Sequence, residues 1–343
     1  MRLAVERDAD LTALNTFGVP ARAPALAVLR DEAQLPALAE LSAREGAPLV
    51  LGGGSNVLFA RDPQRTVLRV ALRGMRFEPD GRGQVRAEAA AGEPWDAFVR
   101  AGVERGLWGL ENLALIWGLV GASPIQNIGA YGVEMRERFE SLRAFDLRAG
   151  TVRTFDPADC RFGYRDSFFK TPAGRDWLVL SVRFRLGRAP APRLDYGELR
   201  DELARRGAPA EDPRAVAEAV SAIRARRLPD PARLGNAGSF FKNPVLEPAA
   251  ADALRARAPD APLHAAGPDA PAGARKASAA WLIERAGWKG VRRGDAGVSD
   301  RHALVLVNHG AASGAQLLAL AAEVQRSVLE RFGVRLEPEP VVV

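Results

Sequence analysis

The first hundred residues alternate between apolar runs, a helical repeat and glycine turns. Residues 25–29 are apolar and predict a short strand. Asp31 and Glu32 open a segment whose leucines recur every three residues, which predicts a helix ending at Gly46. Residues 48–51 predict a fully buried strand that runs straight into three glycines. The pattern therefore predicts a strand–helix–strand opening with a glycine turn after its second strand.

The same reading continues to the end of the chain. Further strands are expected at 67–72, 84–89, 141–147, 151–155, 177–186 and 303–308. Further helices are expected from Pro94 to about Gly102, from Asp212 to about Arg227, from Ser278 to Ala286 and from Ser313 to about Phe332. The composition of 259–274 predicts a loop, and the prolines of 336–340 predict an extended tail. A run rich in proline and glycine at 187–193 suggests a boundary.

Composition narrows the class of protein. The chain has 343 residues, 47% of them hydrophobic and 26% charged, which predicts two or three folded domains. Its one cysteine, Cys160, favours a reducing compartment, and we expect a cytoplasmic protein without membrane insertion. The formal charge of +6 is scattered among acids, so the run 224–227 is interpreted as solvated surface rather than a nucleic-acid site. The three histidines lack metal-ligand spacing, and no metal site is expected.

The most informative segment is 109–132, which carries glycines at 109, 118, 121, 129 and 132 between apolar residues. A buried, nearly uncharged loop leaves backbone N–H groups that need a partner. A second glycine turn, Gly52–Asn56, offers consecutive N–H groups that suit an anion. Taken alone, this turn is equally well a tight connection between two strands. Together, the two segments indicate a long ligand rich in acceptor oxygens, such as a dinucleotide.

These segments resemble the UDP-N-acetylenolpyruvoylglucosamine reductase (MurB) family. The resemblance rests on 51–58 and 109–132, and continues through 160–167, 235–244 and 336–339. It therefore covers nearly the whole chain in order. The family usually has proline where Trp117 stands, and that departure leaves the path of the loop and its affinity for flavin open.

The resemblance implies an α+β protein with α/β elements, in which a vanillyl-alcohol-oxidase-type (PCMH-type) FAD-binding domain precedes a C-terminal α+β substrate-binding domain. The expected boundaries are FAD-binding subdomains at 1–75 and 76–210, a tyrosine loop near 190–200, a substrate domain at 211–335 and a returning tail at 336–343. A monomer is expected.

The implied activity is reduction of UDP-N-acetylglucosamine enolpyruvate to UDP-N-acetylmuramate in peptidoglycan precursor synthesis. Non-covalently bound FAD passes the hydride, NADPH is the reductant, and a serine gives the proton. Two alternatives remain at this stage. One is an FAD-linked sugar or alcohol oxidase of the same fold, and the other is a catalytically weakened protein that binds a nucleotide sugar or flavin.

The resemblance also assigns roles to residues. The catalytic set is Arg165, Ser239 and Glu339, and the substrate-binding set is Tyr131, Tyr196, Asn243 and Lys289. The residues expected to bind FAD are Gly52, Gly53, Gly54, Ser55, Asn56, Val57, Asn112, Gly118, Gly121, Ser123, Gln126, Asn127, Gly129 and Ala130.

The chemistry explains these residue types. Hydride addition to an enol ether conjugated with a carboxylate develops an enolate, which a guanidinium such as Arg165 can stabilise. Serine is a weak acid and needs nearby positive charge, for which Lys242 is a candidate. Two of these residues could instead have a purely structural role: Arg165 in an ion pair with Asp166, and Lys289 as a solvated surface lysine. The sequence alone does not choose between Glu337 and Glu339 as the catalytic glutamate.

Overall fold

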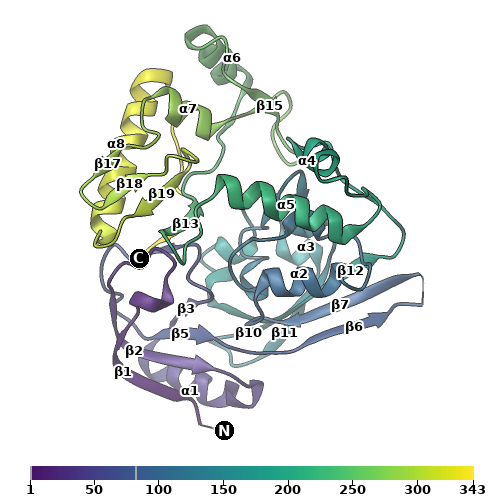
Figure 1. The fold of residues 1–343 in the computed structure, drawn as a ribbon. Helices are drawn as coiled ribbons and strands as arrows, with labels where there is room; N and C mark the ends of the chain where they lie inside the picture. Colours follow the sequence, from purple (N-terminus) through teal and green to yellow (C-terminus); the bar gives the residue numbers. More distant parts are fainter. Residues whose placement is uncertain (1, 82) are drawn as a thin grey trace. The chain divides into compact units, whose positions relative to one another are not determined.

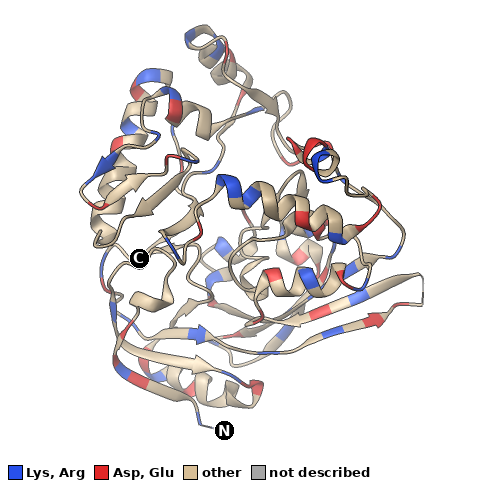
Figure 2. Cartoon of the chain, viewed as in Figure 1, with Lys and Arg blue, Asp and Glu red and all other residues tan. Residues whose placement is uncertain are grey.

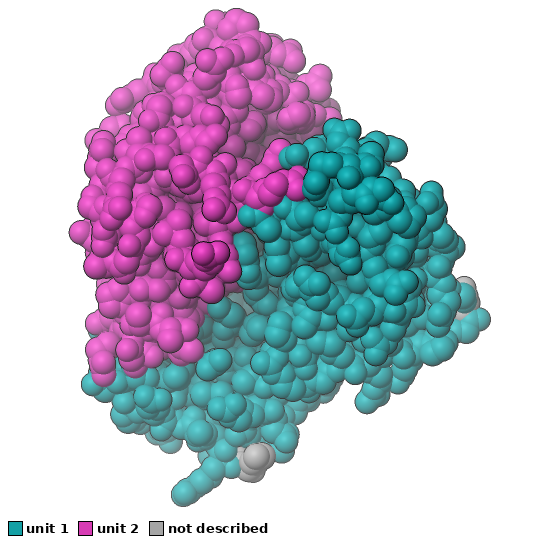
Figure 3. Space-filling model, in the orientation of Figure 1, with its two compact units in different colours: residues 1–9, 23–53, 64–225 teal, residues 10–22, 54–63, 226–343 magenta. Residues whose placement is uncertain are grey.

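The chain forms two compact units in a computed structural model that describes residues 2–81 and 83–343. Unit 1 comprises residues 1–9, 23–53 and 64–225, and unit 2 comprises residues 10–22, 54–63 and 226–343 (Figure 3). Two short N-terminal segments thus belong to the same unit as the C-terminal third of the chain.

Unit 1 contains a four-stranded sheet of order β1-β2-β5-β3, in which β2, β5 and β3 are parallel. The bounds of its strands are β1 (Ala4–Asp10), β2 (Arg22–Leu29), β3 (Leu49–Leu51) and β5 (Val67–Val70). Helix α1 (Leu35–Glu45) follows β2 and buries Leu35, Leu38 and Leu41. The predicted strand–helix–strand opening is therefore confirmed (Figure 1).

A five-stranded antiparallel sheet of order β11-β10-β12-β7-β6 makes up the rest of the unit's main framework. The bounds are β6 (Met75–Pro79), β7 (Gln84–Ala90), β10 (Phe139–Asp146), β11 (Val152–Phe155) and β12 (Trp177–Gly187). Arg183 of β12 lies opposite Glu88 of β7, and its Nη2 donates to that carboxylate at 2.7 Å. Opposite charges at facing positions stabilise this register.

Helix α2 of unit 1 buries aromatic residues against this sheet, and three further helices belong to the unit. Their bounds are α2 (Trp95–Val103), α3 (Pro157–Cys160), α4 (Leu199–Arg206) and α5 (Pro213–Arg227). Trp95 and Phe98 of α2 contact Phe184 of β12, with ring centroids 5.7 and 5.5 Å apart. The short strands β8 (Gly129–Ala130) and β9 (Val133–Glu134) form a hairpin within the glycine-rich segment.

Unit 2 contains two antiparallel sheets, a short parallel pair of strands and three helices. The four-stranded sheet comprises β13 (Gly235–Ser239), β19 (Val305–Asn308), β18 (Ala296–Val298) and β17 (Arg292–Arg293). The three-stranded sheet comprises β14 (Val245–Leu246), β16 (Arg275–Ala277) and β15 (Leu263–Ala265). The helices are α6 (Pro248–Arg257), α7 (Ala279–Arg285) and α8 (Gly314–Phe332). The predicted capping box at Ser313 and Gln316 is present at the start of α8.

Hydrogen bonds explain why the N-terminal segments belong to unit 2. The backbone N–H of Asn236 donates to the carbonyl of Thr16 at 2.9 Å. The last strand, β20 (Val341–Val342), pairs in parallel with β4 (Val57–Leu58). The predicted extended tail is thus an element of sheet structure, which the prolines alone do not reveal.

Some sequence predictions are corrected by the structure. Strand β3 is not fully buried, because Val50 is 37% exposed. The predicted loop 259–274 contains β15, a three-residue strand too short to produce a recognisable alternation. Residues 32–34 form a 3-10 turn, so the α-helix begins at Leu35.

Candidate active site

The two glycine-rich segments are in contact within unit 1. A Cβ atom placed on Gly53 would lie 3.2 Å from the Cα of Gly118. A Cβ atom placed on Gly52 would lie 3.7 Å from the side chain of Leu119 and 3.8 Å from that of Ala122. Backbones can approach this closely only without side chains between them. The segments that the sequence indicated as joint ligand contacts therefore lie together.

Residues of helix α2 form hydrogen bonds with the middle of the glycine-rich segment. The backbone N–H of Trp95 donates to the carbonyl of Gly118 at 3.0 Å, and its indole Nε1 donates to Leu113 at 2.9 Å. The carboxylate of Asp96 accepts from the backbone N–H of Leu115 at 2.6 Å. Leu115 has a left-handed φ of +56°, which is unfavourable for a branched residue unless such contacts impose it. The backbone on both sides of Trp117 is therefore held without a proline.

The later part of the segment is fixed mainly through its backbone. A Cβ atom on Gly121 would lie 2.4 Å from the Cβ of Ala91, and the N–H of Gly121 donates to the Ala91 carbonyl at 3.0 Å. The hydroxyl of Ser123 donates to Val120 at 2.7 Å. Gln126 and Ala130 are partly buried. Close packing and hydrogen bonds therefore fix the backbone of this part of the segment.

Two buried asparagines join the segment to its surroundings. The Nδ2 of Asn112 donates to the carbonyls of Tyr131 and Arg193 at 2.9 and 2.8 Å. The Nδ2 of Asn127 donates to Gly163 at 3.0 Å. The Oδ1 of Asn112 is buried without a hydrogen-bond partner among the described residues. An orphaned buried acceptor in the glycine-rich segment fits a polar ligand such as FAD.

Arg165 points toward this segment. Its Nη2 donates to the carbonyl of Gly129 at 2.7 Å, and its φ is +53°. Tyr131 also has a left-handed φ, +48°, and its ring packs edge-on against Tyr196 at 5.9 Å. Asp166 forms no ion pair with the residues that the structure describes, so the ion pair with Arg165 considered from sequence is absent.

Unit 2 holds the rest of the first glycine turn. The residues predicted to bind FAD that lie in this unit are Gly54, Ser55, Asn56 and Val57. Gly54 has φ +65°, and a Cβ atom there would lie 2.0 Å from the carbonyl oxygen of Leu14. The Nδ2 of Asn56 donates to the carbonyl of Glu339 at 3.4 Å. The glycine turn therefore lies beside the C-terminal tail.

Ser239 and Glu339 are brought close together within unit 2. Ser239 ends β13 and pairs with Val305 of β19 after an irregularity in the register. The backbone N–H of Glu339 donates to the carbonyl of Phe240, the residue after Ser239, at 2.8 Å. Ser239 and Glu339 are both partly buried.

The structure separates the two tail glutamates. Glu337 forms an ion pair with Lys242, with Nζ 3.6 Å from Oε2, and its side chain is 71% exposed. Glu337 thus neutralises Lys242, the cation considered as an aid to Ser239. Asn243 accepts from the backbone of Ala279 at 2.9 Å through Oδ1. Lys289 contacts Glu284, with its Nζ 3.1 Å from Oε1.

Sequence reasoning missed one buried and one partly buried charged residue. Glu111, 1% exposed, accepts from the backbone N–H of Gly109 at 2.5 Å, and burial raises the pKa of its carboxyl. Arg224 was interpreted as surface, but it is partly buried and donates to Leu115 at 3.2 Å. Helical phase from Val216, Val220 and Ile223 could have indicated that this arginine flanks the buried face.

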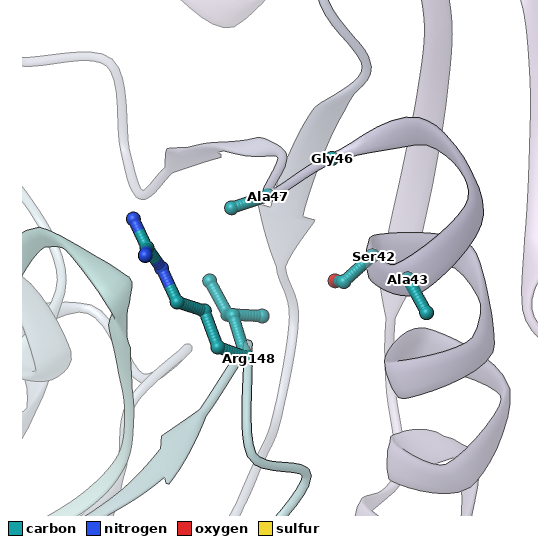
Figure 4. A pocket seen from close by; sticks show the side chains of 6 residues that line it. Ser42, Ala43, Gly46, Ala47 and Arg148 are labelled. Carbon is teal, nitrogen blue, oxygen red and sulfur yellow. The ribbon is translucent and has the colours of Figure 1, made fainter.

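One further cavity lies away from these residues. It has a volume of about 380 Å³ and is lined by Ser42, Gly46, Ala47 and Arg148 among others (Figure 4). The guanidinium of Arg148 is paired with Asp176 at 2.6 Å. None of the predicted site residues lines this cavity.

Charge and hydropathy add two observations. Basic and acidic residues are interspersed along the elements of both units (Figure 2). No helix within the described residues combines the length and the apolar character that a bilayer crossing requires.

Comparison with known proteins agrees with both parts of this description. Residues 23–156 match the FAD binding domain family, and residues 230–343 match the family described as UDP-N-acetylenolpyruvoylglucosamine reductase, C-terminal domain. These two domains define the class: the chain is an oxidoreductase with an FAD-binding domain of the PCMH type and a second α+β domain. The predicted fold class is confirmed.

The relatives identify the family. A UDP-N-acetylenolpyruvoylglucosamine reductase of Pseudomonas aeruginosa is 51% identical over 341 residues, covering 99% of each chain. The protein of that name from Chromobacterium violaceum is 50% identical and covers 100% of both. The crystal structure of MurB from Thermus caldophilus superposes with a TM-score of 0.67 at 26% identity, covering 100% of this chain and 99% of that one. The chain belongs to the UDP-N-acetylenolpyruvoylglucosamine reductase family, as the motifs predicted.

Proposed function

We propose that this protein reduces UDP-N-acetylglucosamine enolpyruvate to UDP-N-acetylmuramate, with NADPH as reductant and non-covalently bound FAD. The observation that carries the proposal is the pairing of the C-terminal tail with the strand that ends at Ser239, in a domain of this family. The reaction is a step of peptidoglycan precursor synthesis. A cytoplasmic monomer remains part of the proposal.

The overall reaction saturates the enolpyruvyl double bond. When bound, FAD supplies a hydride, received from NADPH, to the terminal carbon of the substrate. The hydroxyl of Ser239 donates the proton to the adjacent carbon, and the resulting alkoxide takes a proton back from solvent. Arg165 stabilises the enolate that develops between these events. Glu339 takes part in stabilising the same enolate.

Local structure supports these roles within each unit. Arg165 is fixed by Gly129 and by its own left-handed backbone, so its guanidinium loses little freedom on binding an anion. Glu337, paired with Lys242 and largely exposed, is the weaker candidate for the catalytic glutamate. Tyr131 and Tyr196 contact the substrate, and Asn243 and Lys289 contact its nucleotide part. Lys289 would exchange Glu284 for a phosphate oxygen.

FAD would be held by backbone and side chains of both glycine-rich segments. These residues are Gly52, Gly53, Gly54, Ser55, Asn56, Val57, Asn112, Gly118, Gly121, Ser123, Gln126, Asn127, Gly129 and Ala130. The orphaned Oδ1 of Asn112 suits a donor of the cofactor or an ordered water.

A Ser239→Ala variant tests the assignment of the proton donor. We expect NADPH to reduce its flavin at close to the normal rate, while turnover with the enolpyruvyl substrate falls roughly 10²- to 10⁴-fold, the usual contribution of a general acid. Stopped-flow absorbance at 450 nm separates the two half-reactions. Turnover that survives in Ser239→Ala rules out the serine.

Ser313→Ala is the matched control. It removes the hydroxyl that caps α8, which costs about 1 kcal/mol of stability, and should leave turnover unchanged.

The oxidase alternative predicts rapid reoxidation of the reduced flavin by oxygen and no NADPH oxidation that depends on the enolpyruvyl substrate.

A further inference from the structure

Arg165 lies in a tight turn with an unfavourable backbone conformation. The N–H of Gly163 donates to the carbonyl of Asp166 at 3.0 Å, and the N–H of Asp166 donates back to the carbonyl of Gly163 at 3.3 Å. Arg165 is the third residue of this four-residue turn, and its φ is +53°. A turn with positive φ at this position favours glycine or asparagine, because other side chains add strain. The surrounding structure must therefore hold Arg165 in place.

Two side chains fix the start of the turn. The Nη1 of Arg136 donates to the carbonyl of Phe162 at 2.9 Å. The Nδ2 of Asn127 donates to the carbonyl of Gly163 at 3.0 Å, and its Oδ1 accepts from the backbone N–H of Arg136 at 3.2 Å. These hydrogen bonds tie the start of the turn to the glycine-rich segment, to which Asn127 belongs.

The second half of the turn is held by Lys170. Its Nζ donates to the carbonyl of Arg165 at 3.1 Å. Lys170 ends a 3-10 turn, Phe168–Lys170, which Ser167 caps through its side chain. The hydroxyl of Ser167 also donates to the carbonyl of Ile125 at 2.7 Å. The backbone that carries the lysine is thus anchored, and its half-buried side chain reaches back to Arg165.

A hydrogen bond to this carbonyl acts on the guanidinium of Arg165. The orientation of the carbonyl depends on the backbone angles of Arg165, so holding it fixes the backbone from which the side chain projects. At the far end of that side chain, Nη2 donates to the carbonyl of Gly129 at 2.7 Å. A guanidinium held at both ends needs little reorganisation when negative charge develops beside it.

We propose that Lys170 is a positioning residue of the reduction, which holds the left-handed backbone of Arg165 and so keeps its guanidinium ready to stabilise the enolate. Lys170 acts through Arg165 and does not itself contact the substrate. Its contribution therefore belongs to the reduction of the substrate and not to the reduction of flavin by NADPH. The inference rests on the proposed function, which assigns the enolate to Arg165.

Single-turnover kinetics of Lys170→Met holoenzyme tests this role. Stopped-flow absorbance follows the reduction of flavin by NADPH, and then its reoxidation by saturating enolpyruvyl substrate. We expect reduction at close to the normal rate, while reoxidation slows roughly 10- to 100-fold, because a small misplacement of a catalytic group costs rate in this range. Lys170→Arg should recover part of the loss, since its broader guanidinium still donates to a carbonyl.

Thr171→Val is the matched control. It removes the hydroxyl that donates to the carbonyl of Phe168 at 2.7 Å, a hydrogen bond of the same short segment but outside the turn that carries Arg165. Urea midpoints should fall in both Thr171→Val and Lys170→Met, because each variant loses a hydrogen bond. Only Lys170→Met should slow the reoxidation of flavin.

Three outcomes overturn the role of Lys170. Reoxidation at the normal rate in Lys170→Met shows that Arg165 does not depend on this hydrogen bond. A normal rate with a raised half-saturating concentration of substrate shows that the ammonium binds the substrate instead. Equal slowing in Thr171→Val shows a loss of local stability without any specific action on Arg165.

Lys170→Gln covers a methionine variant that does not fold. Its amide nitrogen lies one bond nearer the backbone than Nζ, so the hydrogen bond to Arg165 weakens, and we expect a smaller loss of the same kind. A normal rate of reoxidation in Lys170→Gln also contradicts the proposal.

The wild type separates this inference from the proposed function. Reduced wild-type flavin that the enolpyruvyl substrate does not reoxidise refutes the proposed function, and the role of Lys170 with it. A wild type that reacts normally, alongside Lys170 variants that do the same, refutes only the role of Lys170.

Discussion

Single residues show how burial changes chemistry in this protein. Cys160 is fully buried, and desolvation, with Asp159 and Asp156 adding to it, raises the pKa of its thiol to about 12. The thiolate is the reactive form of cysteine, so the folded protein should be inert to thiol reagents at pH 8. We expect less than one tenth of the labelling by Ellman's reagent that occurs in urea. Rapid labelling of the native protein would contradict the burial.

The titration of Glu111 affects the stability of the glycine-rich segment 109–132. Because desolvation raises its folded pKa above 4.5, the native state holds a proton that the unfolded state releases. Its contribution to the free energy of unfolding therefore falls as pH rises from about 4.5 through the folded pKa. Relative to the wild type, Glu111→Gln should gain stability over that pH range.

Urea denaturation at several pH values measures this difference. Glu104→Gln removes a carboxylate from an exposed position and serves as the control, for which no such trend is expected. A difference between Glu111→Gln and wild type that does not change with pH would refute the assignment.

Elements in this chain depend on close backbone approaches that glycine permits. Gly54 combines a left-handed φ of +65° with a position where a Cβ atom would meet the carbonyl of Leu14 at 2.0 Å. Gly18 has a similar φ, +62°, with nothing within 4 Å. Gly18→Ala should therefore cost only the backbone strain, about 1–2 kcal/mol.

Gly54→Ala introduces the same backbone strain, and it also requires the turn to move away from Leu14. We expect it to destabilise the protein by clearly more than Gly18→Ala does, measured by urea midpoints, and to weaken FAD binding. Equal costs for the two variants would show that the turn can shift freely away from Leu14.

At the scale of the whole molecule, ligand binding should change the thermal unfolding profile. A chain with two compact units need not unfold in one transition. FAD at a hundred times its dissociation constant should stabilise the native state by about 2.7 kcal/mol. Calorimetry of apoprotein with added FAD should show one transition moving upward, while riboflavin, which lacks the pyrophosphate, should move it less. The absence of any shift with FAD would contradict the role of the glycine-rich segments.

Much of the local structure follows from sequence patterns. The helical repeat of Leu35, Leu38 and Leu41 and the capping box of Ser313 each predicted an element that the structure contains. The glycine-rich motifs also predicted the family, because several short patterns recur in one order along the chain. Several strands of two or three residues, such as β15, escaped prediction, since their stability comes from partners distant in sequence.

The sequence by itself determined the family, the cofactor class and the residue types available for catalysis. Only the tertiary structure decided that the tail lies beside the strand ending at Ser239 and that Glu337 pairs with Lys242. It also showed that Arg224 is partly buried and donates to the carbonyl of Leu115. The physical reason is that periodicity and capping act between near neighbours in the chain. Ion pairing, desolvation and strand pairing depend on distances between residues that lie far apart in the sequence, as Val57 and Val341 do.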